Sequence, residues 1–386
     1  MSISDTASTP SRPLDGLRVI DFSRVLAGPL IGQTLGDLGA DVIKVERPGH
    51  GDDTRTWGPP WHEDQATYYL SLNRNKRSIV LDLKDEEDVA FARRLALTGD
   101  VILDNFKPGF MADLGLDRRS LSKERPEIVT ATITAFGAGT DAADLPGYDL
   151  VAQAMGGLMH LTGESDGRPL RVGVPIVDMM TGLNATIGVL AALTERAATG
   201  VGRHVEVALF DTAVASLLNH HTSTLMGGSN PVRGGNRHPS IAPYESFSAS
   251  DGDLIIAAAN DKLFAGLCRA IERPALCEDE RYANNTARAA NADSLISEIN
   301  QALAHGTRAE WINKLRAQDV PCGPINSIPE ALAWGADIGA DLELVAGSYH
   351  AVRSPIRIDG VTNGDTTPPP RLGEHSEQIR REIDGL

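Results

Sequence analysis

The chain has 386 residues, 41% of them hydrophobic and 23% charged, a composition typical of a globular enzyme long enough for two domains. Its formal net charge is −16 and its pI about 5.0, which argues against nonspecific binding to nucleic acid or anionic membranes, since both require a net basic face. The three scattered cysteines (Cys268, Cys277 and Cys322) and the lack of a secretory signal or an unbroken apolar run of ~20 residues predict a soluble, cytoplasmic protein with free thiols.

The first third of the chain alternates short apolar runs with helical stretches. Continuous apolar strands joined by helices predict a parallel sheet covered on both faces, with ligands at the carboxyl ends of the strands. The expected strands are RVIDFS (18–23), ADVIKVE (40–46), SIVLDL (78–83), DVILDNF (100–106) and EIVTATITAF (127–136).

The rest of the chain predicts a second, smaller domain. Residues 148–221 are expected to be mostly helical, with GRHVEVALF as an interposed strand, and the Gly- and Pro-rich segment 227–244 to be a long connection. A hairpin turning at Asp251–Gly252 follows, and then helices around 261–272, 291–305 and 307–318. The expected domains are a large domain that begins with 1–227, a small domain at 228–325, and a tail at 326–386 that returns to the large domain.

Basic residues gather near several expected strand ends, although the total charge is acidic. This placement favours an anion pocket there, while each cluster taken alone is typical of a solvated face. The residues concerned are Lys44, Arg47, Arg74, Lys76, Arg77, Lys84 and Lys107. The sequence contains no GxGxxG after the first strand and no P-loop, HExxH or GxSxG motif. The adjacent pair His220–His221 does not predict a metal site, because neighbouring side chains on a helix point apart.

One carboxylate stands in an apolar run, Asp178 in VGVPIVDMMTGLNATIGVLAAL (172–193). Because a helical pattern follows it, one interpretation is an N-cap whose side chain accepts from first-turn amides. The other is a functional carboxylate that stays ionised at the helix start, beside amides that could receive an oxyanion, and attacks an activated acyl group. The residue pattern does not separate these interpretations.

Motifs along nearly the whole chain give a resemblance to the class III coenzyme A transferases, a family that includes formyl-CoA transferases, carnitine CoA-transferases and 2-methylacyl-CoA racemases. The motifs are PLDGLRVIDFSRVLAGP, LGADVIKVERPGHGDDTR, NRNKRSIVLDLK, DVILDNFKPG, GYDLVAQAMGGLMHLTG, GRHVEVALFDTAV, GGNRHPSIAPY, VPCGPIN and RLGEH. The resemblance implies an α/β fold with a Rossmann-like large domain, a parallel sheet, a smaller α+β domain, and an interlocked homodimer.

The resemblance also assigns roles to residues. Asp178 falls on the family's nucleophile, which would form an acyl–aspartyl anhydride and then an aspartyl–CoA thioester. CoA would contact Val25, Leu26, Ala27, Arg47, Leu81, Asp82, Leu83, Lys84, Asn105, Phe106, Lys107 and Tyr148. A CoA thioester and a free carboxylic acid are the implied substrates, with no metal, no tightly bound cofactor, no nucleic acid and no membrane.

Two departures from the family pattern concern the phosphate contacts: Asp113 stands where some transferases have a basic residue, and Pro146 where formyl-CoA transferases have lysine. Closure of the site would involve a lid flanked by Gly227–Gly228 and Gly234–Gly235, for which a plain flexible linker is the alternative.

Two other functions compete with CoA transfer. A 2-methylacyl-CoA racemase would use Asp178 for proton transfer, but the family's partner histidine is replaced here by Tyr148, a poor base near pH 7. His160 or His221 could in principle supply that base, although packing roles suit each better. A CoA-binding scaffold without catalysis is the third hypothesis, and the retained Asp178 argues against it.

Overall fold

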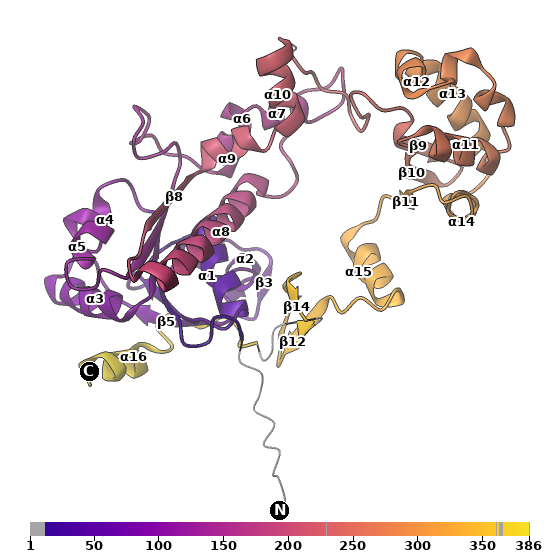
Figure 1. Cartoon of the computed structure of the whole chain (residues 1–386). Coiled ribbons are helices and arrows are strands. Elements are labelled where there is room, and N and C mark those ends of the chain that lie inside the picture. Colours follow the sequence, from indigo (N-terminus) through magenta and orange to yellow (C-terminus); the bar gives the residue numbers. More distant parts are fainter. Residues whose placement is uncertain (1–11, 229, 360, 363–365, 386) are drawn as a thin grey trace, which may run out of the picture. The chain divides into compact units, whose positions relative to one another are not determined.

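The structure is a computed structural model that describes residues 12–228, 230–359, 361–362 and 366–385. These residues form two compact units (Figure 1). The first unit takes the described residues up to 159, then 171–228, and those from 343 onward; the second takes 160–170 and 230–342. The second unit therefore extends further than the expected small domain of 228–325, and the chain returns to the first unit at residue 343.

A six-stranded parallel sheet forms the centre of the first unit. All five strands expected from the first part of the sequence are confirmed, together with the interposed strand. The strands, in spatial order, are β5 (Lys76–Val80), β2 (Asp41–Glu46), β1 (Arg18–Asp21), β6 (Val101–Asp104), β7 (Val129–Thr134) and β8 (His204–Ala208). The winding direction reverses between β1 and β6, and in such doubly wound sheets ligands bind outside the carboxyl ends of the strands at this switch point.

Helices cover both faces of this sheet (Figure 1). On one face, α1 (Ala27–Asp37) and α8 (Ile176–Thr199) contribute Ile31, Leu35, Ala185 and Val189 to a cluster with the strands. The other face carries α3 (Glu86–Thr98), α4 (Phe110–Asp113), α5 (Arg118–Leu121) and the late helix α16 (Ser376–Asp384), which packs against β5. The expected α/β class with a parallel sheet is therefore confirmed.

Helix α8 is the longest element of the first unit. Among the described residues it is the one helix long and apolar enough to cross a membrane, judged by length and composition. Its buried side includes Val177, Ala185 and Val189, while Met179, Leu183 and Ile187 on another side are exposed.

Shorter elements complete the first unit. They are η1 (Asp53–Thr56), β3 (Trp61–His62), β4 (Gln65–Ala66), α2 (Thr67–Leu70), α6 (Asp149–Met155), α7 (Leu158–Leu161, which reaches into the second unit), α9 (Leu209–Ala215), α10 (Leu218–Gly227), β12 (Glu343–Ala346), β13 (Tyr349–Val352), β14 (Arg357–Ile358) and β15 (Val361–Thr362).

The second unit is a small antiparallel sheet with helices. The expected hairpin is confirmed, since β9 (Tyr244–Ala249) and β10 (Gly252–Ala257) pair directly, and β11 (Cys322–Pro324) joins the other edge of β10. The three expected helices are confirmed as α11 (Asp261–Ala270), α13 (Ala292–Leu303) and α14 (Arg308–Arg316). The remaining elements are η2 (Pro274–Cys277), η3 (Glu280–Tyr282), α12 (Asn285–Ala290) and α15 (Ile328–Asp337).

Candidate active site

A cavity of about 210 Å³ lies at the carboxyl ends of β1, β6 and β7. The loop after β1 supplies Arg24–Ala27, the loop after β6 supplies Asn105–Pro108, and Tyr148 and Asp178 complete the wall. This is the position that the reversal of strand order predicts for a ligand.

A second cavity of about 430 Å³ adjoins the first, because Arg24, Phe106 and Lys107 line both. Its other walls include Arg47 after β2 and residues 81–84 after β5. Every residue that the sequence resemblance assigned to CoA lines one or both of these cavities. The fold thus brings together side chains from four separate strand ends.

Asp178 is the third residue of α8, with only 8% of its surface exposed at the edge of the first cavity. Burial raises its pKa to about 7, and the nearby Asp149 carboxylate adds to the rise. Within the described residues, no donor forms a hydrogen bond with the Asp178 carboxylate. The sequence analysis expected this carboxylate to stay ionised; a dry, negatively charged neighbourhood instead raises its pKa so that the ionised and neutral forms coexist near neutral pH.

The N-cap interpretation of Asp178 is also wrong, because the Asp149 side chain, not that of Asp178, accepts hydrogen bonds from the first-turn amides of α8. Asp149 is the first residue of α6, and its Oδ1 accepts from the backbone N–H groups of Val177 (2.8 Å) and Asp178 (3.2 Å). Its Oδ2 accepts from Gln153 Nε2 at 2.6 Å. The first-turn amides expected to receive an oxyanion are thus already occupied.

Sequence reasoning missed Asp149, although it directly follows Tyr148 in the GYD motif. No local pattern links Asp149 to α8, because the contact forms only in the folded protein. The N-cap residue of α8 is Pro175, which has no side-chain oxygen, so the first amides of the helix need an acceptor from another segment. Tyr148 itself is 60% exposed beside the first cavity.

The loops after β1 and β6 are joined across the switch point. The Arg24 backbone N–H donates to Asn105 Oδ1 (2.9 Å), and Asn105 Nδ2 donates to the Arg24 carbonyl (2.7 Å). The Arg24 guanidinium lies 5.1 Å from the centre of the Phe106 ring, which gives that ring a cationic neighbour. Sequence reasoning assigned Asn105 and Phe106 to CoA, but placed Arg24 only at a strand end where polar chemistry was expected and gave it no role.

Cations at the mouth of the two cavities differ in how far they are neutralised. Asp53 lies between Arg24 (3.6 Å) and Arg47, with which it forms a close ion pair. Lys84 and Lys107 are exposed, and in the described part of the chain neither ammonium group has an ion-pair partner. These two ammonium groups are therefore available to bind an anion.

Four other basic residues named in the sequence are neutralised by carboxylates, although one of them, Lys44, lines the larger cavity. Lys44 pairs with Asp52 at 2.8 Å and Lys76 with Asp21 at 2.9 Å, both inside the protein. The last two also pair with carboxylates, Arg74 with Asp37 and Arg77 with Asp41. The expectation of four free cations fails because each is neutralised by a carboxylate, and a buried charge requires such a partner.

The four glycines expected to flank a lid line neither cavity. Gly227 ends α10 and Gly228 follows with φ +65°, whereas Gly234 and Gly235 belong to the second unit. His221 lies on α10 and lines neither cavity. Of the two departures, Pro146 lines the first cavity and Asp113 ends α4. No group of three His, Cys, Asp or Glu side chains able to hold a metal occurs among the described residues.

The sheet is doubly wound, and two adjoining cavities and a buried acid lie at its switch point. This arrangement is typical of a ligand-binding α/β enzyme. The sequence matches CoA-transferase family III over residues 14–376, so the chain belongs to that family. It is 42% identical to succinate–glutarate CoA-transferase of Agrobacterium fabrum, over 97% of this chain and 96% of that protein.

Two further likenesses agree with this assignment. The chain is 38% identical to mouse (Mus musculus) succinyl-CoA:glutarate CoA-transferase, over 96% of this chain and 86% of that one. A crystal structure of a CAIB/BAIF family protein from Brucella suis has a TM-score of 0.87 and 42% identity, covering 97% of this chain and all of the other. The resemblance in the sequence is thereby confirmed: this is a family III CoA-transferase.

Proposed function

We propose that the protein moves CoA from an acyl-CoA donor to a free carboxylic acid through covalent intermediates on Asp178. The observation that carries this proposal is the position of the Asp178 carboxylate. It is buried, has no hydrogen-bond donor among the described residues, and faces a cavity at the sheet's switch point. A carboxylate without hydration is a stronger nucleophile than one in water.

In the proposed reaction, an Asp178 oxygen attacks the donor's thioester carbonyl, and the C–S bond breaks to release CoA thiolate and leave a mixed anhydride. The thiolate then attacks the aspartyl carbonyl, which gives an aspartyl–CoA thioester and frees the donor's carboxylate. The acceptor carboxylate attacks that thioester, forming a new anhydride and again releasing thiolate. Attack of the thiolate on the acceptor's carbonyl yields the product acyl-CoA and restores the Asp178 carboxylate. Each step exchanges one acyl bond for another, so thioester energy is not lost to water.

The two cavities supply matching sites for CoA. Phosphate oxygens would meet Lys84, Lys107 and Arg47, whose charges lie at the mouth of the larger cavity. Leu81 and Phe106 give that cavity an apolar wall for the adenine and pantetheine, while the loop at Val25–Ala27 would guide the thioester toward Asp178. In this arrangement, the smaller cavity holds the acyl group.

For the acids, we propose short dicarboxylates. The support is that relatives 42% and 38% identical to this chain are named for succinate or succinyl-CoA and glutarate. Racemisation is less favoured, since no histidine is among the described residues that line the Asp178 cavity.

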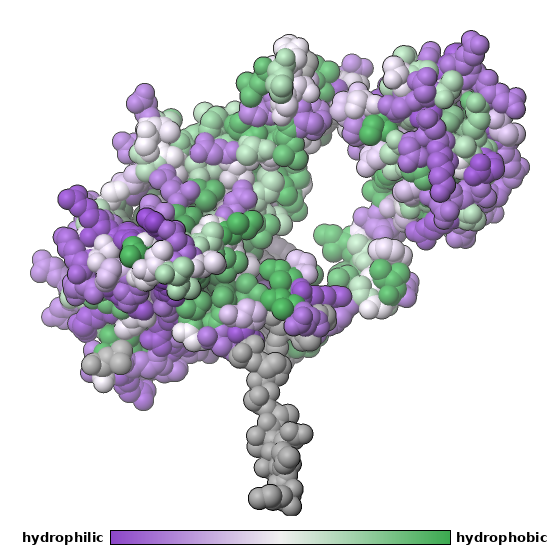
Figure 2. Space-filling view, viewed as in Figure 1, coloured by the Kyte–Doolittle hydropathy of each residue, from purple (hydrophilic) through white to green (hydrophobic). Residues whose placement is uncertain are grey.

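We further propose that two chains interlock as a homodimer. Apolar side chains on α8 and α10 support this proposal: Leu183 is 47%, Ile187 65% and Met226 86% exposed. Figure 2 shows hydrophobic residues reaching the surface over this part of the first unit. Exposed apolar area of this kind typically marks an interface. Native mass spectrometry should give a dimer that yields no folded monomer on dilution; a stable monomer would contradict the proposal.

The central test is Asp178→Ala. Transfer from succinyl-CoA to glutarate should disappear while CoA affinity stays within about tenfold of the wild type, because the carboxylate reacts rather than anchors. Incubation of the wild type with succinyl-CoA and hydroxylamine should inactivate it and place a hydroxamate on Asp178, as detected by peptide mass spectrometry.

Three results would contradict the proposal: near-normal turnover by Asp178→Ala, a hydroxamate on another residue, or no exchange of CoA with any acid tested. Deuterium wash-in at C2 of a 2-methylacyl-CoA without CoA exchange would instead establish a racemase.

A further inference from the structure

The loop that separates β1 from α1 is strained at Val25. Its φ is +72°, in the left-handed region that glycine adopts freely and a β-branched residue avoids. Such a conformation persists only where surrounding contacts impose it, and it is concentrated at functional sites. Because Val25 lines the Asp178 cavity, the contacts that fix its backbone conformation also fix the shape of that cavity.

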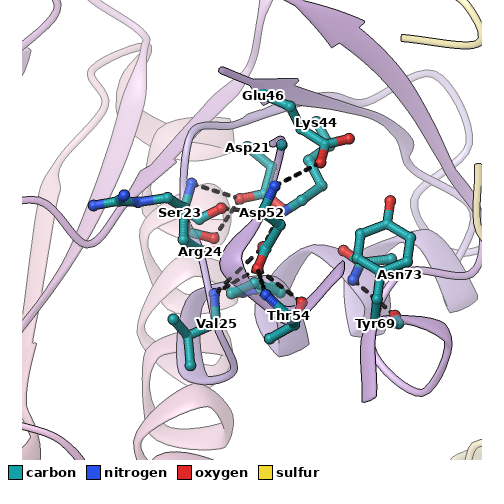
Figure 3. Close-up of polar contacts among 12 residues, drawn as sticks. Asp21, Ser23, Arg24, Val25, Lys44, Glu46, Asp52, Thr54, Tyr69 and Asn73 are labelled. Carbon is teal, nitrogen blue, oxygen red and sulfur yellow. Dashed lines mark hydrogen bonds and ion pairs between the residues drawn. The ribbon is translucent and has the colours of Figure 1, made fainter. Parts of the chain in front are cut away.

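Asp52 supplies the contacts that hold this backbone in place (Figure 3). The Val25 N–H lies 3.3 Å from both carboxylate oxygens of Asp52. Asp52 Oδ1 also accepts from Thr54 N (2.9 Å) and Thr54 Oγ1 (2.8 Å), which fixes the orientation of the carboxylate.

Lys44 completes the arrangement from β2. Its Nζ lies 2.8 Å from Asp52 Oδ2 and donates to the Ser23 carbonyl at 2.9 Å, so one ammonium group contacts the loop directly at Ser23 and indirectly through Asp52. Both the Lys44 and the Asp52 side chain are fully buried. Buried ion pairs of this kind add little stability over apolar residues of equal size, since desolvation offsets the attraction. A role in fixing geometry is therefore a better reason for this pair than stability.

The far end of the same loop lies against α8. A Cβ placed on Gly182 would stand 2.7 Å from the Ala27 carbonyl oxygen, so only glycine allows the start of α1 to approach α8 this closely. Gly182 is one turn beyond Asp178 on the same helix. This close contact ties the end of the loop to the helix that carries Asp178.

We propose that Asp52 and its buried partner Lys44 are positioning residues for CoA transfer: by holding Val25 in a strained turn, they align the thioester with Asp178. This inference rests on the proposed function, because it assumes that the thioester meets Asp178 beside this loop. Neither residue contacts the reacting atoms; both act through the backbone of Val25–Ala27.

The experiment combines removal of the anchor with removal of the strain. Asp52→Ala should lower kcat by about tenfold or more, a loss on the scale of such strain. In a Val25→Gly background, glycine adopts φ > 0 unaided. There, the same Asp52→Ala change should lower kcat by no more than about threefold. Val25→Ala is the matched background, since it shortens the side chain without freeing the backbone, and the full loss should remain in it.

Two controls separate positioning from general damage. Asp37→Asn breaks another buried ion pair, with Arg74, at the far end of α1, and should leave kcat within about twofold. If Asp52→Ala does not fold, the double variant Lys44→Met with Asp52→Asn removes both charges together and leaves no unpaired buried ion. Because it also removes the ammonium group that holds the Ser23 carbonyl, it should lower kcat by about tenfold, and by no more than about threefold in a Val25→Gly background.

The inference fails if Asp52→Ala changes kcat no more than Asp37→Asn does, or if Val25→Gly gives no better rescue than Val25→Ala. A folded double variant with the kcat of the wild type would equally overturn it. Hydroxylamine labelling of Asp178 distinguishes these results from failure of the proposed function. If wild-type Asp178 is labelled and the Asp52 variants behave like the control, only the positioning role is wrong.

Discussion

Asp178→Asn should make the protein more stable, and increasingly so as the pH rises. The folded pKa of Asp178, about 7, is above the ordinary value of 3.8, so the fold favours the protonated acid. This contribution is fully present below about pH 4 and is lost as the pH rises through about 7. At 1.36 kcal/mol per pKa unit, a rise of roughly three units means that the ionised form costs about 4 kcal/mol above pH 8. An amide of the same shape carries no such cost.

The measurement is the unfolding midpoint of the wild type and of Asp178→Asn between about pH 5 and about pH 8.5. We expect the stability difference to grow by about 2–3 kcal/mol over this range, with each kcal/mol shifting the midpoint by roughly 1–2 °C in a chain of this size. Hydrogen exchange of the α8 amides gives a second readout confined to the first unit. A difference that stays constant with pH, or that shrinks as the pH rises, would refute the burial argument.

Three further predictions concern activity. Asp149→Asn removes the negative charge that helps raise the pKa of Asp178, so the acid limb of the kcat/KM profile, at about pH 7 in the wild type, should move to lower pH; an unmoved limb would contradict the coupling. Gly182→Ala places a methyl group 2.7 Å from the Ala27 carbonyl oxygen and should lower kcat by about tenfold or more at a KM changed far less, as steady-state kinetics would reveal. Lys107→Ala should raise KM for the acyl-CoA by about tenfold and flatten its salt dependence, whereas an unchanged KM would exclude a phosphate contact.

Much of the fold could be predicted from the sequence. The six strands of the parallel sheet were recognisable because each contains a short β-branched run, as is typical of strands in a covered parallel sheet. The two-residue strands β3 and β4 were not predicted. The hairpin of β9 and β10 was visible at its Asp251–Gly252 turn. The extension of the second unit to residue 342 was not, since α15 has no local signal that assigns it to one unit or the other.

For the candidate site, the residues that line the cavities were predicted, whereas their charges and pKa shifts were not. Its cavity residues follow strand ends, so the resemblance and the sheet pattern both located them, and the structure brings them together. The electrostatics depended instead on contacts between distant segments. Asp149 caps α8 from another helix, and Lys76 on β5 meets Asp21 on β1 only once both strands join the sheet. Neither the high pKa of Asp178 nor the neutralisation of that lysine was therefore visible locally.

The placement of α16 has a consequence for synthesis of the protein. Ile379 and Ile383 fill the face of the sheet built by the earliest strands, and Arg77 on β5 pairs with Glu382. Before α16 is synthesised, the part of that face beside β5 lacks the cover that α16 gives it, although α3, α4 and α5 already pack on the same face. We therefore expect nascent chains halted before residue 376 to depend more on chaperones than chains that include α16.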